Sequence, residues 1–268
     1  MRKSRLTLDG ASLTLDQLRQ FERERPEVEL ADAARARMRE SEATVVATVA
    51  AGRTAYGMNT GFGAFANRVI PAQKTQKLQL NLVRSHACGV GEPLPATLVR
   101  RMLLLKANNL AAGFSGVRPL VVDTLLALIN ADVLPVIPAQ GSVGASGDLA
   151  PLAHLCGVLI GEGEATGPTT AGAESRRLLA GLELLRAAGV EPLALQAKEG
   201  LALLNGTQFS TANALAGLFE TEQLFQTALV TGVLLLLGGA GSSPAGLVGY
   251  TFAAFVLTTI VLEFARGT

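Results

Sequence analysis

The sequence predicts a mainly α-helical fold with a few short strands. Glycine accounts for 29 of the 268 residues, only 4% of the chain is aromatic, and there is no tryptophan. Such a composition is typical of helices in close contact and not of a β-sandwich. Most segments carry apolar residues at helical spacing. A chain of this length can bury a large core in one or two domains.

Capping and spacing signals set the order of the predicted elements. A short strand is expected over 4–8, and Thr14 is suited to cap a helix that Pro26 ends. The glycine-rich segment 54–67 and the polar segment 161–172 break the periodicity and are predicted to be loops. Helices are expected over residues 29–51, 72–87, 95–112, 117–131, 149–160, 173–188 and 207–230.

Composition and charge exclude several classes of protein. A net charge of +1 leaves no basic stripe of the kind that nucleic-acid binding requires. Cys88 and Cys156 have no recognisable spacing, so we expect two small buried side chains in a reducing, cytoplasmic environment. The basic start is not followed by an apolar run, so no secretory signal is predicted. Because His and Cys form no metal-binding motif, no metal is expected.

Residues 61–66, GFGAFA, fit the glycine pattern of dinucleotide-binding loops. That pattern needs a strand before it and a helix after it within a βαβ unit, whereas a long helix is predicted before it here. We therefore predict no nucleotide site. The same loop carries Tyr56 and Asn59, a phenol and an amide beside open backbone, which favours a binding loop over a plain turn.

The stretch GSVGASGDLAPLAH, residues 141–154, has almost no bulky side chain in its first half. One interpretation is a tight loop in which Asp148 caps the next helix. Another is chemical. The unhindered amide nitrogen of Gly147 attacks the carbonyl carbon of Ala145, and Ser146 loses its hydroxyl, so that two water molecules leave and a five-membered electrophilic ring forms. Such a ring provides an electron sink that protein side chains lack.

Other polar residues have ordinary explanations in the sequence. His86, late in a predicted helix, and His154, one turn inside the helix over 149–160, are most simply structural. Asn205 and Thr207 suit the cap of the helix that follows them.

The stretch GSVGASGDLAPLAH resembles the prosthetic-group motif of the aromatic amino acid ammonia-lyases, in which an Ala-Ser-Gly triad becomes 4-methylidene-imidazol-5-one (MIO). The resemblance covers the chain from about Arg5 to Gly232. Four further blocks resemble that family in the same order: YGMNTGFG (56–63), NLVRSHACGVGEP (81–93), NNLAAGFSGVRP (108–119) and KEGLALLNGTQFSTA (198–212).

By this resemblance the chain has three parts. Residues 1–203 would form a head domain with short strands and the MIO loop, and residues 204–232 would begin a long-helix bundle. Residues 233–268 form a divergent apolar tail whose second apolar piece, 247–262, is shorter than a bilayer span, so a membrane partner is not expected. Family members are much longer and complete their active sites with later residues. This chain is therefore expected to be truncated, with turnover by the chain alone left open.

The resemblance also implies residue roles. Ala145, Ser146 and Gly147 would form MIO with the help of Asp148, and Tyr56 would take the β-proton of the substrate. Because a free phenol is protonated near neutrality, the surroundings of Tyr56 would have to favour its ionised form. The residues expected to bind the substrate are Asn59, His86, Asn205 and Gln208.

The implied reaction is the elimination of ammonia from L-histidine to give trans-urocanate. The pair Ser85–His86 favours histidine over phenylalanine or tyrosine as the substrate. A lyase or aminomutase acting on phenylalanine or tyrosine, and a non-catalytic truncated product, are the alternatives. Family members are homotetramers with shared active sites, so the expected partners are the substrate and further copies of the chain.

Overall fold

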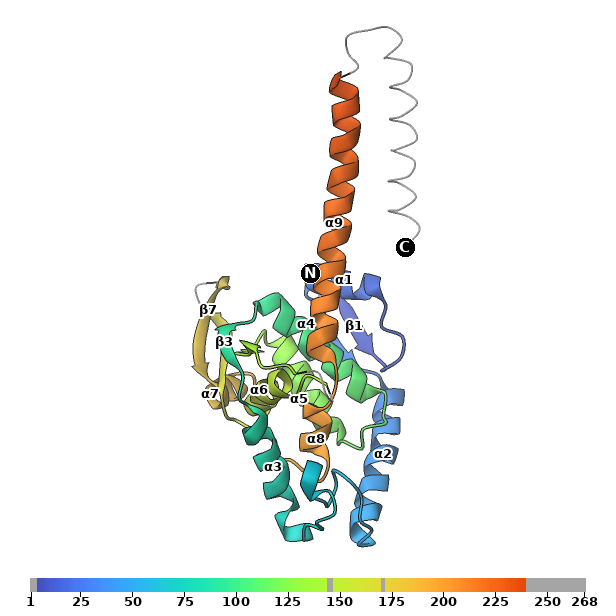
Figure 1. The fold of residues 1–268 in the computed structure, drawn as a ribbon, viewed down its shortest axis with the longest axis vertical. Helices are drawn as coiled ribbons and strands as arrows, with labels where there is room; N and C mark the ends of the chain where they lie inside the picture. Colours follow the sequence, from blue (N-terminus) through green and yellow to red (C-terminus); the bar gives the residue numbers. More distant parts are fainter. Residues whose placement is uncertain (1–3, 144–146, 170–171, 240–268) are drawn as a thin grey trace. The chain divides into compact units, whose positions relative to one another are not determined.

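The computed structural model describes residues 4–143, 147–169 and 172–239 (Figure 1). The helices are α1 (Leu15–Glu24), α2 (Asp32–Ala50), α3 (Thr75–His86), α4 (Ala96–Ala111), α5 (Pro119–Asn130), α6 (Leu149–Leu159), α7 (Gly181–Ala187), α8 (Glu199–Leu204) and α9 (Gln208–Gly239). The strands are β1 (Arg5–Leu8), β2 (Glu27–Leu30), β3 (Val90–Pro93), β4 (Leu134–Pro135), β5 (Pro138–Gln140), β6 (Glu164–Thr169) and β7 (Gly172–Ala180). Single turns of 3-10 helix occupy Gly63–Phe65 and Ala72–Lys74. The predicted mainly α fold with short strands is confirmed.

The chain forms two compact units, residues 1–212 and 213–268. The first contains the described strands, the helices α1 to α8 and the start of α9. The second, in its described part, continues α9 to Gly239, beyond the predicted end at residue 230. Nowhere in the described ranges is a helix long and apolar enough to span a bilayer.

The start of α1 follows from the sequence alone. Thr14 Oγ1 accepts a hydrogen bond from the backbone N–H of Gln17 at 3.2 Å, and the Gln17 side chain accepts from the backbone N–H of Thr14 at 2.9 Å. This reciprocal capping box satisfies two N–H groups and stabilises the helix by about 1 kcal/mol. Arg25, in the left-handed conformation with φ of 49°, ends the helix just before Pro26.

The predicted helix over 29–51 begins later than expected, because residues 27–30 form strand β2. This strand pairs in parallel with β1, and the alternate residues Val28 and Leu30 are buried. On its other edge, the Asn130 side chain accepts from the Val28 N–H at 2.8 Å and donates to the Val28 carbonyl at 2.9 Å. Two neighbours distant in sequence thus satisfy the backbone of β2, and α2 begins only at Asp32.

The sequence prediction is also wrong over residues 161–188. Strands β6 and β7 form an antiparallel hairpin, and β4 pairs with the outer edge of β6. The segment predicted as a loop is therefore partly β6, and the helix predicted over 173–188 is reduced to α7. Pairing along the hairpin gives these residues hydrogen-bond partners that a local helical pattern does not reveal.

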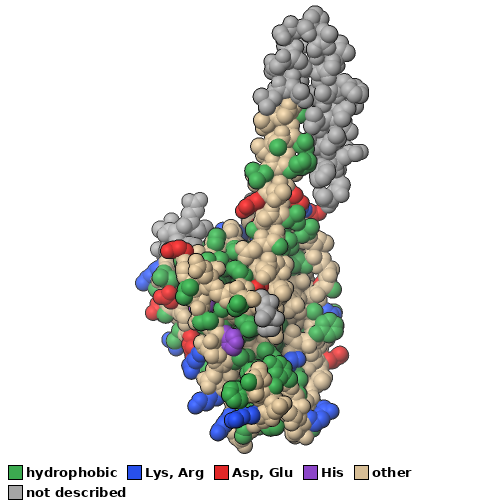
Figure 2. Space-filling model, viewed as in Figure 1, with side chains coloured by type: hydrophobic (Ala, Val, Ile, Leu, Met, Phe, Trp, Pro, Cys, Tyr) green, Lys and Arg blue, Asp and Glu red, His purple; other side chains and the backbone are tan. Residues whose placement is uncertain are grey.

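The core of the first unit is built on α4, α5 and α6. Helix α4 packs against α5, and α6 packs against α3, α7 and α8 (Figure 1). Cys156 on α6 is buried, as predicted, whereas the prediction for Cys88 is wrong because it is exposed in the segment between α3 and β3. Figure 2 shows charged side chains of both signs around the edge of the visible face, in agreement with the small net charge.

Candidate active site

The loop before α6 meets the turn between α8 and α9 at two glycines. Gly147 and Gly206 form a parallel bridge, and the backbone N–H of Asp148 donates to the carbonyl oxygen of Gly206 at 2.8 Å. Gly147 has a φ of +104°, and a Cβ on it would lie 2.3 Å from the Gly206 oxygen. Only glycine fits at this position, because any side chain would be both strained and in collision with backbone.

The carboxylate of Asp148 is buried and accepts hydrogen bonds from two serines. Its Oδ1 accepts from Ser142 Oγ at 2.8 Å and from Ser210 Oγ at 2.6 Å, and its Oδ2 accepts from the Ser210 backbone N–H at 2.8 Å. Asp148 is the N-cap residue of α6 by position, but its side chain makes no capping bond there. The side-chain cap interpretation is therefore wrong, and the carboxylate instead ties the loop to the first turn of α9.

Removing the Asp148 carboxylate should loosen this junction. Asp148→Ala leaves the Ser210 N–H without its acceptor, so we expect the free energy of unfolding to fall by about 3 kcal/mol. Asp148→Asn keeps an oxygen for that N–H, and the two hydroxyls can turn to accept from the new amide, so the loss should be about 1 kcal/mol. Urea denaturation measures both variants. Asp16→Ala, which removes an exposed ion pair with Arg19, is the control and should change little; equal losses for Ala and Asn would contradict the assignment.

A buried lysine lies against the same turn. Lys106 on α4 is fully buried, and its Nζ donates to the carbonyl oxygen of Asn205 at 3.0 Å and lies 3.4 Å from Gln208 Oε1. Both of these acceptors are uncharged oxygens. Burial lowers the pKa of Lys106 from its ordinary 10.5 to about 7, and burial raises the pKa of the neighbouring Cys156 thiol to about 12.

The lowered pKa of Lys106 makes the stability of the chain depend on pH. Between the folded value of about 7 and the unfolded value of 10.5, the unfolded chain holds a proton that the folded chain has released, so stability rises with pH. Relative to Lys106→Met, the wild-type chain should gain about 1–2 kcal/mol between roughly pH 7.5 and pH 9. Urea denaturation of both chains at the two pH values checks this prediction. A difference in the free energy of unfolding that stays the same at both pH values would contradict it.

Tyr56 and Asn59 lie in the loop after α2, in different surroundings. Tyr56 is 56% exposed, and its ring packs edge-on against the Phe62 ring, with 5.8 Å between centroids. Asn59 is buried; its Nδ2 donates to the Arg53 carbonyl at 2.9 Å and its Oδ1 accepts from the Ala55 N–H at 2.9 Å. The amide of Asn59 therefore maintains the shape of the loop, while the Tyr56 ring is open to solvent.

Gln79 on α3 joins this loop to α8. It is fully buried; its Nε2 donates to the Gly57 carbonyl at 3.3 Å, and its Oε1 accepts from the Leu201 N–H at 3.1 Å. A Cβ on Gly57 would lie 2.2 Å from Leu201 Cδ2. The loop that carries Tyr56 thus packs on the helix that leads directly to Asn205.

His86 is the last residue of α3. Its Nδ1 lies 2.8 Å from the Leu82 carbonyl oxygen, and because a carbonyl can only accept, Nδ1 carries the proton and Nε2 of the neutral ring is an acceptor. The Gly89 N–H donates to His154 Nε2 at 3.0 Å, and a Cβ on Gly141 would lie 3.0 Å from Gly89 Cα. Burial lowers the pKa of His154, in keeping with the structural role predicted for it. The segment after His86 is thereby held against the start of the loop before α6.

The structure brings four of the predicted site residues into one junction: Gly147, Asp148, Asn205 and Gln208. Ala145 and Ser146 lie outside the described residues. The sequence analysis missed three residues of the junction: Lys106, Ser142 and Ser210. Only Lys106 had a signal in the sequence, because it is a charge inside the apolar run LLLKANNLA. Within the described ranges, no three side chains of His, Cys, Asp and Glu gather as a metal site requires.

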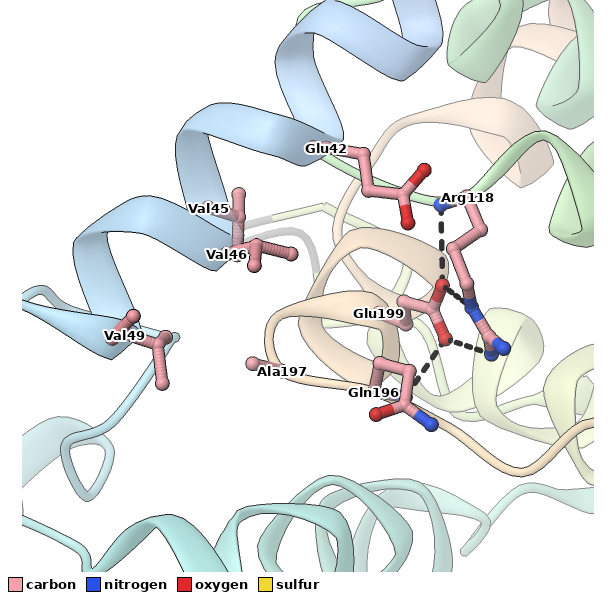
Figure 3. Close-up of a pocket in the computed structure, with 10 residues that line it drawn as sticks. Glu42, Val45, Val46, Val49, Arg118, Gln196, Ala197 and Glu199 are labelled. Carbon is pink, nitrogen blue, oxygen red and sulfur yellow. Dashed lines mark hydrogen bonds and ion pairs between the residues drawn. The ribbon is translucent and has the colours of Figure 1, made fainter.

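A cavity of about 450 Å³ opens beside α2 and is not lined by the described residues of this junction (Figure 3). Figure 3 shows valines of α2, among them Val45 and Val49, on one side of it and the pair Arg118–Glu199 on the other. The buried Glu199 carboxylate accepts from Arg118 Nε and Nη2, each at 2.8 Å. With its carboxylate already paired, Glu199 supports the fold rather than offering a free charge to a ligand.

The chain resembles known proteins over most of its length. The family model described as aromatic amino acid lyase matches residues 13–245. A histidine ammonia-lyase of Burkholderia pseudomallei (strain 668) is 50% identical over 239 residues, which are 88% of this chain and 45% of that protein. The crystal structure of histidine ammonia-lyase from Trypanosoma cruzi matches with a TM-score of 0.77 and 39% identity, over 88% of this chain and 44% of that one. A tyrosine aminomutase from Streptomyces globisporus matches with a TM-score of 0.77 and 33% identity, over 86% and 42%.

This chain therefore spans under half the length of the relatives that it matches. The family match includes the Tyr56 loop, the end of α3 and the junction of Gly147 with Gly206. It also runs past Gly232, where the predicted tail begins. The chain belongs to the aromatic amino acid lyase family.

Proposed function

We propose that the chain is the N-terminal portion of an enzyme that eliminates ammonia from L-histidine to give trans-urocanate. The observation that carries the proposal is the junction of Gly147 and Asp148 with the turn at Asn205 and Gly206. It joins the end of the Ala-Ser-Gly triad, a buried carboxylate and a candidate substrate-binding amide. The 50% identity with a protein named histidine ammonia-lyase supports the choice of substrate.

The residues present fit an MIO group. Gly147 is held in a conformation that only glycine adopts readily. Because glycine has no side chain, nothing on this residue hinders its amide nitrogen. Asp148, with its carboxylate fixed by two serines, is placed next in the chain and would assist ring closure. Formed from Ala145, Ser146 and Gly147, MIO supplies an electron acceptor that side chains lack.

Tyr56 and His86 would act on the substrate directly. The exposed phenol of Tyr56 is open to a ligand, and its oxygen would take the β-proton. His86 uses Nδ1 to donate to Leu82, so its Nε2 would accept a hydrogen bond from the N–H of a substrate imidazole. This preference for a donor favours histidine over the hydrocarbon ring of phenylalanine.

The three remaining candidates divide into two kinds. Asn205 offers a side chain on an exposed turn and would bind the substrate or the prosthetic ring. The Asn59 amide is bonded to Arg53 and Ala55, and the Gln208 amide oxygen faces Lys106. We propose that these two amides act by holding the loops around the site.

The mass of the peptide that spans Gly141 to Asp148 tests the proposal. A deficit of two water molecules, together with release of urocanate from L-histidine by the chain alone or combined with a full-length relative, is the expected result. An unmodified peptide in the folded chain would contradict the proposal. A deficit with release of cinnamate from phenylalanine or of coumarate from tyrosine instead would favour the phenylalanine or tyrosine enzymes. A deficit without turnover of any of the three amino acids would favour a non-catalytic product.

We also propose that the enzyme works as a homotetramer in the cytoplasm. The family resemblance supports the tetramer, and the free thiols of Cys88 and Cys156 suit a reducing compartment. Sedimentation equilibrium of the purified chain should show a mass near four chains; a monomer at all concentrations would contradict it.

A further inference from the structure

Lys106 is placed where the substrate-binding turn and the prosthetic-group loop meet. Its amine lies 3.0 Å from the carbonyl oxygen of Asn205. The next residue, Gly206, bridges Gly147 and accepts from the Asp148 N–H at 2.8 Å. One buried donor on α4 is therefore a single residue away from the backbone contact of Gly206 with Gly147 and Asp148.

The segment that Lys106 touches is held from two sides. From α4, Arg101 Nη1 donates to the Ala212 carbonyl at 2.6 Å, and Lys106 donates to Asn205. From the opposite loop, the Asp148 carboxylate accepts from the Ser210 N–H and hydroxyl. Residues 205–212 are thus fastened to α4 at both ends and to the loop before α6 in between.

The contact of the Lys106 amine with the Asn205 carbonyl is better suited to orienting the turn than to stabilising the fold. An apolar side chain would fill the same space on α4 without the cost of burying an amine. A neutral amine still has two N–H groups, which match the two oxygens of Asn205 and Gln208 that surround it. Unlike a hydrocarbon side chain, the amine fixes the direction of the Asn205 carbonyl through its hydrogen bond, and it thereby fixes the position of Gly206.

We propose that Lys106 is a positioning residue for the prosthetic group: by holding the Asn205 carbonyl, it keeps Gly206 in register with Gly147 and so sets the geometry in which the MIO ring closes. The ring-closing part of this inference rests on the proposed function, whereas the positioning of the turn does not. Lys106 itself touches neither the triad nor the substrate.

The test compares the full chain with Lys106→Met and with Lys77→Met, a matched control on the exposed surface of α3. Amide hydrogen exchange reports on the Asp148 N–H and on residues 205–211, and peptide mass gives the fraction of the chain that has lost two waters. For Lys106→Met we expect exchange at these amides to be at least tenfold faster and the ring fraction to fall at least tenfold. The melting temperature at pH 7 should be unchanged or higher, because the cost of burying the amine is gone. Lys77→Met should match the wild type in all three readouts.

Three results would overturn the inference. One is unchanged exchange at Asp148 and over 205–211 in Lys106→Met. Another is faster exchange there with an undiminished ring fraction. The third is a lowered melting temperature with faster exchange throughout the chain, because it would make Lys106 a general support of the fold. If the wild-type peptide carries no ring, the proposed function fails, and the exchange measurement alone then decides whether Lys106 positions the turn.

Discussion

Replacing Gly147 with alanine is expected to abolish ring formation and to lower the free energy of unfolding by about 3 kcal/mol or more. The backbone at this residue has a φ of +104°, a region that residues with a side chain rarely occupy. The new methyl carbon would lie 2.3 Å from the oxygen and 2.8 Å from the nitrogen of Gly206. Both are backbone atoms, so the collision can be relieved only by separating the loop from the turn.

Gly189→Ala is the matched control for this substitution. Gly189 also has a positive φ, of 71°, but no atom lies within 4 Å of the position of a Cβ. It should therefore cost only the conformational strain, about 1 kcal/mol, and leave the ring intact. Urea denaturation and the mass of the 141–148 peptide measure both effects. If Gly147→Ala keeps the two-water deficit, or loses no more stability than Gly189→Ala, the close contact with Gly206 does not govern ring formation.

Tyr56→Phe is expected to slow urocanate formation by about 10²- to 10⁴-fold, the usual contribution of a positioned acid or base. The substitution removes only the phenol oxygen. The ring is exposed and its described contact, the edge-on packing on Phe62, is preserved by phenylalanine. The melting temperature and the ring content should therefore match those of the wild type, so that the loss is confined to turnover.

The other tyrosine of the chain provides the control for Tyr56. Tyr250→Phe removes the same oxygen from a residue to which no role is assigned, and its turnover should equal that of the wild type. Initial rates of urocanate absorbance, measured with saturating L-histidine, compare the three chains. Equal rates for Tyr56→Phe and the wild type would remove Tyr56 from the reaction.

Local signals in the sequence were sufficient where the structure depends on neighbours in the chain. The capping box of Thr14 and Gln17 sets the start of α1, and the run of apolar residues after Asp148 sets α6. The glycine-rich stretch also singled out Gly147, because its unhindered amide nitrogen suits ring closure. In this stretch a few adjacent residues indicate both the backbone conformation and the proposed ring closure.

Long-range contacts account for what the sequence did not predict. Strand β2 is completed by the side chain of Asn130, and the junction at Gly147 by Lys106 and Ser210. None of these partners is near its target in the chain, and only Lys106, a charge inside an apolar run, stands out locally. The direction of their side chains toward one another is a property of the packed helices, which periodicity alone does not specify.

On the proposed function, the bridge between Gly147 and Gly206 also implies when the ring would form during synthesis of the chain. During synthesis, at about 5–20 residues per second, the triad is made seconds before the turn that must hold it. A nascent chain that ends before Gly206 lacks the partner of this bridge, so its triad should remain unreacted. The loss of two waters would then identify each molecule in which the first unit has been fully synthesised and the turn has docked on the triad.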